Sequence, residues 1–114
     1  MASTLNFSHV NGDTFDEVAF VVTINGVKAD FTDAIIRMQL RKKACDLKAA
    51  LSLTSVANAG LTIVDAINGL FKINKQVINV DVYNYVYDIE IEFADGTIKT
   101  YIRGNFNILE EVTR

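Results

Sequence analysis

The segment that most constrains the fold is residues 83–103, YNYVYDIEIEFADGTIKTYIR. In its first half, aromatic and aliphatic side chains alternate with polar or charged ones. The apolar positions are Tyr85, Tyr87, Ile89, Ile91 and Phe93. A period of two residues is typical of a strand with one face in a core and the other in water. We therefore expect a half-buried strand here, on which the remaining segments pair or pack.

The second half of this segment predicts the return strand of a hairpin. Asp95-Gly96 can supply the positive φ angles of a tight turn. After the turn, one face carries Ile98, Thr100 and Ile102, and the other carries Lys99, Tyr101 and Arg103. Gly104 breaks the alternation, which Phe106 and Ile108 then resume. We therefore expect an interruption of the strand at residue 104.

Shorter alternating segments precede this hairpin, with turn signals between them. Residues 1–10 are interpreted as an edge strand or an extended arm, and residues 18–24 as a strand covered on both faces. Asn25-Gly26 closes a second hairpin candidate. The remaining strand-like segments are residues 34–41 and the hairpin formed by residues 61–64 and 70–73.

Residues 44–54, ACDLKAALSLT, allow two interpretations. Leu47, Ala49, Leu51 and Leu53 alternate as in a strand, whereas the alanine-rich first part suits one or two helical turns. The strand is favoured, because residues 34–41 need a hairpin partner.

Strands at regular spacings, turn signals between them and no long helical pattern indicate an all-β fold. We expect an immunoglobulin-like antiparallel β-sandwich of about seven to nine strands. A chain of 114 residues has room for one domain with one core, so residues 1–114 are expected to form a single domain. The side chains expected in the core are Phe20, Val22, Ile36, Met38, Leu40, Ile63, Phe71, Tyr87, Ile89 and Ile91.

The charge pattern predicts which strands are neighbours. Residues 35–41 carry Arg37, Gln39 and Arg41 on their outward face, and residues 85–93 carry Asp88, Glu90 and Glu92. Opposite charges across adjacent strands stabilise their pairing. We therefore expect these two strands to lie side by side and antiparallel.

The composition narrows the function classes. A net charge of −3 argues against a dedicated nucleic-acid binder. The single cysteine, Cys45, rules out an internal disulfide framework, and no N-terminal apolar run resembles a secretory signal. We therefore expect synthesis in a reducing compartment. The longest apolar run, residues 18–22, is too short to span a membrane.

Few side chains are candidates for chemistry. His9 is the single histidine, so a metal site would lack the further ligands it needs, and a structural or solvated role is expected. Asp88, Glu90 and Glu92 could bind calcium or act as an acid and a base, but a solvated sheet face also explains them and is favoured. We assign no catalytic, cofactor-binding or metal-binding residue and do not expect an enzyme.

A short basic run, Arg41-Lys42-Lys43, precedes Cys45. Neighbouring positive charge can lower the pKa of a thiol, but no base partner is evident, so an inert cysteine is favoured. The run is too small to bind nucleic acid by itself.

Tyr85 and Tyr87 have a spacing found at one corner of immunoglobulin-type sandwiches. Such domains place a tyrosine two residues before the central buried position of the strand that follows the corner. Tyr85-Val86-Tyr87 matches this spacing, and we interpret it as a packing feature.

The order of several motifs resembles a group of small tailed-phage and prophage proteins. This group includes the N-terminal immunoglobulin-like domain of phage baseplate upper proteins. The motifs are Gly12-Asp13-Thr14-Phe15, residues 36–42 (IRMQLRK), residues 61–65 (LTIVD) with Gly69-Leu70-Phe71, residues 85–90 (YVYDIE), residues 93–97 (FADGT), Gly104-x-Phe106-x-Ile108 and residues 111–114 (EVTR). The resemblance therefore covers residues 12–114. In place of the Pro-Gly loop that the group often has after the basic run, this chain has Lys43-Ala44-Cys45-Asp46.

The resemblance implies a non-enzymatic structural component of a tailed-phage virion, in the tail, baseplate, neck or head. Its implied partners are other virion proteins, with a homo-oligomer or ring in the assembly and no nucleic acid or membrane. The protein would be made in the host cytoplasm and reside in the virion. The alternative is a carbohydrate- or receptor-binding module displayed on the particle. Sugar binders usually expose aromatic side chains, and only Tyr101 and Tyr83 are expected to face outward here.

The terminal segments carry alternating apolar residues that would gain little from exposure to water. These residues are Leu5, Phe7, Phe106 and Ile108. An exposed strand edge can pair with another chain. We therefore expect residues 1–10 and 104–114 to act as extended assembly segments that pack on a neighbouring subunit.

Overall fold

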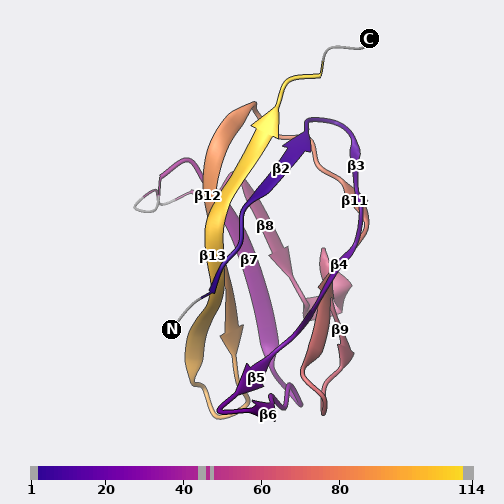
Figure 1. The fold of residues 1–114 in the computed structure, drawn as a ribbon, viewed down its shortest axis with the longest axis vertical. Helices are drawn as coiled ribbons and strands as arrows, with labels where there is room; N and C mark the ends of the chain where they lie inside the picture. The colour runs from indigo at the N-terminus through magenta and orange to yellow at the C-terminus, as the bar shows by residue number, and fades with distance from the viewer. Residues whose placement is uncertain (1–2, 44–45, 47, 112–114) are drawn as a thin grey trace.

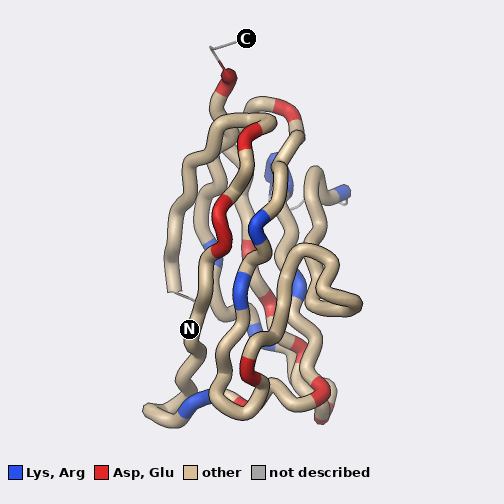
Figure 2. Tube along the Cα trace, turned by 90° about the vertical axis from the view of Figure 1, so that its right-hand side faces the viewer, with Lys and Arg blue, Asp and Glu red and all other residues tan. Residues whose placement is uncertain are grey.

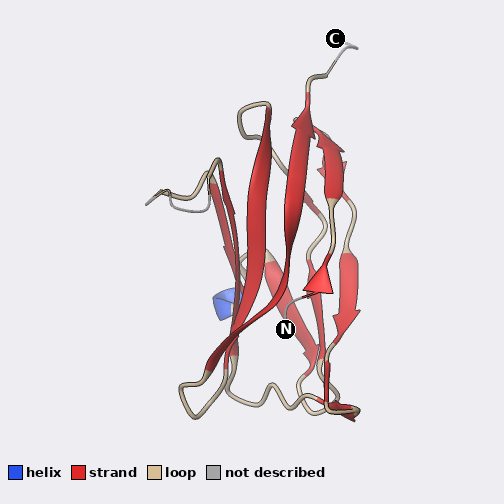
Figure 3. Cartoon of the chain, turned by 60° about the vertical axis from the view of Figure 1, so that its left-hand side comes forward, coloured by secondary structure: helices blue, strands red, loops and turns tan. Residues whose placement is uncertain are grey.

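The computed structural model describes residues 3–43, 46 and 48–111, and it confirms the expected all-β fold with strands packed in a sandwich. Figure 3 shows the strands in layers, with one short helical turn at the side. The described strands are β1 (Ser3–Thr4), β2 (Phe7–Val10), β3 (Thr14–Phe15), β4 (Val18–Val21), β5 (Thr23–Ile24), β6 (Val27–Lys28), β7 (Ile35–Arg41), β8 (Leu51–Thr54), β9 (Leu61–Asp65), β10 (Leu70–Ile73), β11 (Gln76–Val77), β12 (Tyr83–Glu92) and β13 (Ile98–Leu109).

The larger sheet has the order β1-β13-β12-β7-β8, with β2 also paired to β13 (Figure 1). The smaller sheet has the order β4-β10-β9, and the two ribbons β3–β11 and β5–β6 complete the ends. Strands β13, β12 and β7 take the places of G, F and C in an immunoglobulin-like sandwich, and β4, β10 and β9 take those of B, E and D. The molecule is elongated, with extents of 45 × 28 × 25 Å.

The hairpin β12–β13 is the centre of the larger sheet, as the sequence predicted. Ten residues of β12 pair with β13, and Tyr85, Tyr87, Ile89 and Ile91 on the predicted face are all buried. The turn of this hairpin differs from the expected one, in which Asp95-Gly96 supplies the positive φ angles. Phe93 N–H donates to the Thr97 carbonyl at 2.8 Å, so residues 94–96 form a three-residue loop. Only Gly96 of this loop has a positive φ, at 89°, as in a type I turn followed by a bulge.

A second bulge changes which residues of β13 face the core. Ile89 pairs with Ile102, but Glu90 pairs with Thr100, so Tyr101 is an extra residue in the ladder. An extra residue reverses the alternation beyond it. Ile102 is buried as expected, whereas Ile98 is 55% exposed. The prediction that Ile98 and Ile102 share one face is therefore wrong.

Gly104 does not interrupt β13, which runs unbroken to Leu109. The N-terminal segment passes so close to Gly104 that a Cβ atom here would overlap the carbonyl oxygen of Leu5. Leu5 N–H donates to the Arg103 carbonyl at 3.0 Å. The glycine thus permits close approach of two backbones, which a break in the alternation cannot distinguish from a strand end.

The predicted pairing of β7 with β12 is confirmed. The two strands are antiparallel, with Arg37 opposite Glu90 and Gln39 opposite Asp88. Along β7 the side chains alternate between half-buried and fully buried. The charges on the outward face therefore favour β12 as the partner of β7. The buried apolar residues on the other face favour the register of this pair.

The core lies between the two sheets and contains most of the predicted residues. Phe20 and Ile63 differ, because they are only partly buried against it. Aromatic residues that the sequence did not assign to the core also fill it, including Phe15, Phe31 and Phe106. Phe31 packs against Phe71 with ring centroids 6.0 Å apart.

The two terminal segments belong to this chain's own sheet. Strands β1 and β2 run parallel to β13, and Phe7 packs against Phe106 with centroids 5.2 Å apart. Phe106 and Ile108 are both buried. The structure thus corrects the expectation that Phe7, Phe106 and Ile108 pack on a neighbouring subunit, because they pack in or against the core of the same chain, whereas Leu5 is 37% exposed. Residues 112–114 lie outside the described residues.

Strand β4 is not covered on both faces, so that expectation is wrong. It is an edge strand of the smaller sheet, and Val21 on its outer face is 51% exposed. Uncharged side chains on an edge strand imitate the pattern of a central strand. The β5–β6 hairpin at Asn25-Gly26 is present as expected.

The segment that allowed two interpretations forms a strand at its end. Strand β8 pairs antiparallel with β7, as the favoured interpretation required. Residues 44, 45 and 47 lie outside the described residues. The one helical element described is the 3-10 turn Val56–Asn58. Across the described residues, no helix has the length and apolar character needed to cross a membrane.

Candidate functional site

The outer face of the larger sheet carries a grid of polar side chains from three strands. One row has Arg41, Val86 and Asn105, and the next has Gln39, Asp88 and Arg103. Residues directly opposite on neighbouring strands have Cβ atoms about 5 Å apart. Figure 2 shows that acidic and basic residues occur along the length of the molecule, and neither sign is confined to one end.

Arg37 binds both glutamates that the sequence singled out. Its Nη1 donates to Glu90 Oε1 at 2.9 Å, and its Nη2 donates to Glu92 Oε1. The hydrogen bond to Glu92 contributes most to raising the pKa of the Arg37 guanidinium. Of the three carboxylates that the sequence analysis considered for chemistry, Glu90 and Glu92 are thus bound by Arg37, and Asp88 is not. Among the described residues, no group of three His, Cys, Asp or Glu side chains could hold a metal ion.

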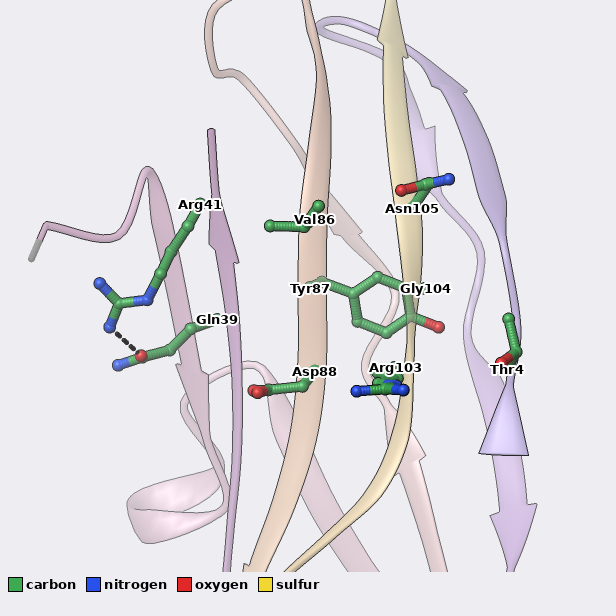
Figure 4. A pocket seen from close by; sticks show the side chains of 9 residues that line it. All are labelled: Thr4, Gln39, Arg41, Val86, Tyr87, Asp88, Arg103, Gly104 and Asn105. Atoms are coloured by element: carbon green, nitrogen blue, oxygen red, sulfur yellow. Dashed lines mark hydrogen bonds between the residues drawn. The ribbon is translucent and has the colours of Figure 1, made fainter. Parts of the chain in front are cut away.

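The grid encloses a shallow groove of about 390 Å³. Its lining residues are Thr4, Gln39, Arg41, Val86, Tyr87, Asp88, Arg103, Gly104 and Asn105. Figure 4 shows Asp88 on β12, between Gln39 on β7 and Arg103 on β13. Burial raises the pKa of Asp88, as does the charge of Glu90, while Arg41 opposes both effects. The residue as a whole is exposed, so its neighbours remove only part of the water around the carboxylate.

Two side chains of the basic run contact neutral polar or aromatic groups. Arg41 donates to Gln39 Oε1 and to the carbonyl of Asp46, each at 2.5 Å. The Lys42 ammonium lies 5.2 Å from the centroid of the Tyr83 ring, within reach of a cation–π contact. Cys45, the thiol considered beside this run, is outside the described residues.

His9 has a structural environment. Its Nε2 lies 2.9 Å from the carbonyl oxygen of Asp13, and its ring meets the edge of Phe15 with centroids 5.4 Å apart. This contact joins β2 to the turn that follows it, in agreement with the structural role expected for the residue.

The tyrosine pair also has the role that its spacing indicated. Tyr85 Oη donates to the carbonyl of Asp81, four residues upstream, at 2.7 Å. This is the hydrogen bond of a tyrosine corner. Tyr87 Oη donates instead to the carbonyl of Leu5, which ties the N-terminal segment to β12.

Several strand edges in the described chain carry backbone groups without a partner strand. In β8, Ser55 N–H donates to the Ile36 carbonyl at 2.9 Å, which fixes the alternation of the ladder. The N–H and C=O groups of Ser52 and Thr54 therefore point away from β7. Ala59 accepts from Thr54 N–H at 2.8 Å, whereas Ser52 has no backbone partner among the described residues.

The sequence did not single out Arg103, Asn105, Lys99 or Thr100. Arg103 and Asn105 join the groove because β13 continues past Gly104. Lys99 and Thr100 line a second hollow because the bulge at Tyr101 turns them. Bulges leave no dependable sequence signal, so local patterns could not have found this second set.

No protein-family model matches the chain, and no curated protein matches it in sequence.

Proposed function

We propose that this chain is a non-enzymatic structural component of a tailed-phage virion, which holds neighbouring subunits through the edges of its β-sheets. The observation that carries the proposal is the set of open strand edges on β4, β8 and the first part of β13. Unpaired N–H and C=O groups on such an edge can accept a strand from another chain.

Two further features support this role. The motif order described in the sequence resembles that of small tailed-phage proteins across residues 12–114. The larger sheet also places both terminal segments in its own hydrogen-bond ladder, and the elongated body suits a fixed position in an assembly.

Mass spectrometry of purified particles tests this proposal. Prophage induction in the strain that carries the gene should yield particles in which this chain is present in fixed ratio to the major tail or capsid protein. Deleting the gene should give incomplete particles by electron microscopy. Absence of the chain from particles that contain the other structural proteins would overturn the proposal.

The second candidate is a carbohydrate- or receptor-binding module, which the groove on the outer sheet face favours. Gln39, Asp88 and Asn105 offer amide and carboxylate groups of the kind that bind sugar hydroxyls. A glycan array with the wild type and with Asn105→Ala tests it. Specific binding that Asn105→Ala abolishes would support this candidate, and an array without a signal would oppose it.

A further inference from the structure

A second hollow lies where the edges of the two sheets approach each other. Its volume is about 360 Å³. Its lining residues are Val22, Thr23, Ile24, Asn25, Ile91, Phe93, Lys99, Thr100 and Tyr101. We call this hollow the edge slot. Val22 and Ile91 at its base are buried core residues, so the slot opens directly onto the core.

One wall of the edge slot is an open edge of β13. Phe93 and Thr97 form a hydrogen-bonded pair at the start of the hairpin. Because hydrogen-bonded and non-hydrogen-bonded pairs alternate in an antiparallel ladder, the N–H and C=O groups of Ile98 and Thr100 point away from β12. Strands β1 and β2 cover β13 only from Ile102 onward in the described chain. In the described chain, the backbone N–H and C=O groups of these two residues therefore have no partner strand beside the slot.

The opposite wall is formed by Val22, β5 and Asn25, which directly follow the edge strand β4. Val22 N–H donates to the Gly69 carbonyl at 2.9 Å, so the backbone groups of Ala19 and Val21 point away from β10. Tyr101 Oη reaches across to the Val21 carbonyl with a long hydrogen bond of 3.4 Å. This hydrogen bond links β13 to β4 across the slot.

The path of the N-terminal segment explains this opening. In immunoglobulin sandwiches a strand A lies beside strand B, which corresponds here to β4. The first described strands of this chain pair with β13 instead. The position beside β4 is thus free of any described strand.

We propose that the edge slot receives an extended strand from a neighbouring subunit, which pairs with β13 at Ile98 and Thr100. This inference rests on the proposed structural role and names the surface and the partner chemistry. The outward backbone N–H and C=O groups of Ile98 and Thr100 require a partner segment in β-strand conformation. The apolar base formed by Val22, Ile91 and Phe93 requires small apolar side chains at alternate positions of that strand.

Lys99 adds a charge requirement. It is paired with Ile91 across the hairpin and so lies on the core-facing side of β13, at the exposed mouth of the slot. A residue of the incoming strand opposite Lys99 lies on this same side, where opposite charges attract and like charges repel. The partner strand therefore carries Asp or Glu between its apolar residues.

Fluorescence anisotropy with a labelled heptapeptide tests the slot directly. The probe is Thr-Val-Thr-Asp-Thr-Val-Thr, with an N-terminal fluorescein, and the control probe has Lys in place of Asp. We expect the Asp peptide to bind the full chain saturably, and the Lys peptide to bind about fivefold or more weakly. Absence of saturable binding of the Asp peptide would overturn the proposal.

Two variants locate the binding. Thr100→Pro removes an N–H that points outward, a position where an edge strand tolerates proline, and should abolish binding. Ser52→Pro makes the same change on the open edge of β8 and should bind as the wild type does. If Thr100→Pro fails to fold, Lys99→Glu replaces it, because this variant should prefer the Lys peptide. Equal preference in Lys99→Glu and wild type would contradict the inference.

Failure of this inference can be told apart from failure of the proposed function. Peptide binding is measured on the isolated chain, whereas the structural role is measured in purified particles. Normal particles assembled with Thr100→Pro would overturn the slot and leave the structural role standing. Absence of the chain from particles would overturn the role, whatever the peptide does.

Discussion

Arg37 on β7 lies directly opposite Glu90 on β12, and its guanidinium also reaches Glu92 two residues further along the same strand. All three side chains are about one-third exposed, at 34%, 34% and 33%. One cation therefore offsets part of the negative charge of two neighbouring carboxylates on the outer sheet face, where solvent still screens part of the attraction.

Replacing this cation should destabilise the sheet modestly. Arg37→Ala leaves Glu90 and Glu92 close together without a partner, so we expect a loss of about 1 kcal/mol in the free energy of unfolding. Urea denaturation at low and high salt measures it, and the loss should shrink as salt screens the charges. Arg103→Ala is the control, since Arg103 forms no ion pair among the described residues. An equal loss in both variants would contradict the prediction.

The hairpin offers a matched pair of isoleucines for testing the core. Ile89 is fully buried, whereas Ile98 on the same hairpin is 55% exposed. Ile89→Ala should cost about 2–5 kcal/mol, and Ile98→Ala should change stability by less than about 0.5 kcal/mol. Thermal and chemical denaturation measure both. A melting temperature for Ile89→Ala within a degree or two of wild type would show that Ile89 is not core.

Tyr87→Phe should loosen the N-terminal segment. The Tyr87 hydroxyl donates to the Leu5 carbonyl, and its loss should cost about 1 kcal/mol. Hydrogen exchange should accelerate most at residues 7–10, which follow Leu5 and pair with β13. Unchanged exchange in these amides would show that the hydroxyl does not hold the segment.

The same hydroxyl predicts a loss of stability at alkaline pH. Burial raises the pKa of Tyr87 to about 12, whereas an unfolded tyrosine ionises near pH 10. Below about pH 10 both states keep the proton, so this group makes stability neither rise nor fall with pH. Between about pH 10 and 12 only the unfolded state loses it, and folding weakens as the pH rises. Burial also raises the pKa of Tyr85, so Tyr87→Phe should reduce the alkaline loss without removing it.

Asp88→Asn should stabilise the fold at neutral pH. The pKa of Asp88 is raised, first by burial and then by Glu90, so its charged form is disfavoured in the folded state. A neutral amide removes this penalty above the carboxyl titration range, whereas below about pH 3 the carboxyl is already protonated. Melting temperatures at pH 7 and pH 3 should thus differ from wild type only at pH 7. A gain at both values would point to packing instead of charge.

Gly104→Ala tests the close approach of the N-terminal segment. The added methyl group would overlap the Leu5 carbonyl and come within 2.8 Å of Asn6 Oδ1, so we expect a loss of about 1–3 kcal/mol. In a variant without residues 1–6 the same substitution should be nearly neutral, because both clashing residues are gone. Equal losses in the two backgrounds would place the clash elsewhere.

Much of the fold was predictable because it depends on local alternation. The face of β12 that carries Ile89 follows from a period of two, and the pairing of β7 with β12 follows from charges such as Arg37 and Glu90. The role of Tyr85 followed from its spacing alone. Such features need no knowledge of distant segments, since each strand buries its own apolar face.

Other features depended on contacts between segments far apart in the sequence. The bulge at Tyr101 turns Ile98 from the core-facing to the solvent-facing side of β13. No local sequence pattern indicates an extra residue in a ladder. Gly104 marked a break in the sequence, yet in the fold it admits the backbone of Leu5.

The sequence by itself determined an all-β chain, its central hairpin and the neighbour of that hairpin, because a strand's apolar period and its charges are properties of the strand alone. Only the tertiary structure decided that the N-terminal segment pairs with β13 and leaves the edge of β4 open. That choice depends on the contact of Phe7 with the core residue Phe106, and it creates the edge slot at Lys99 and Thr100.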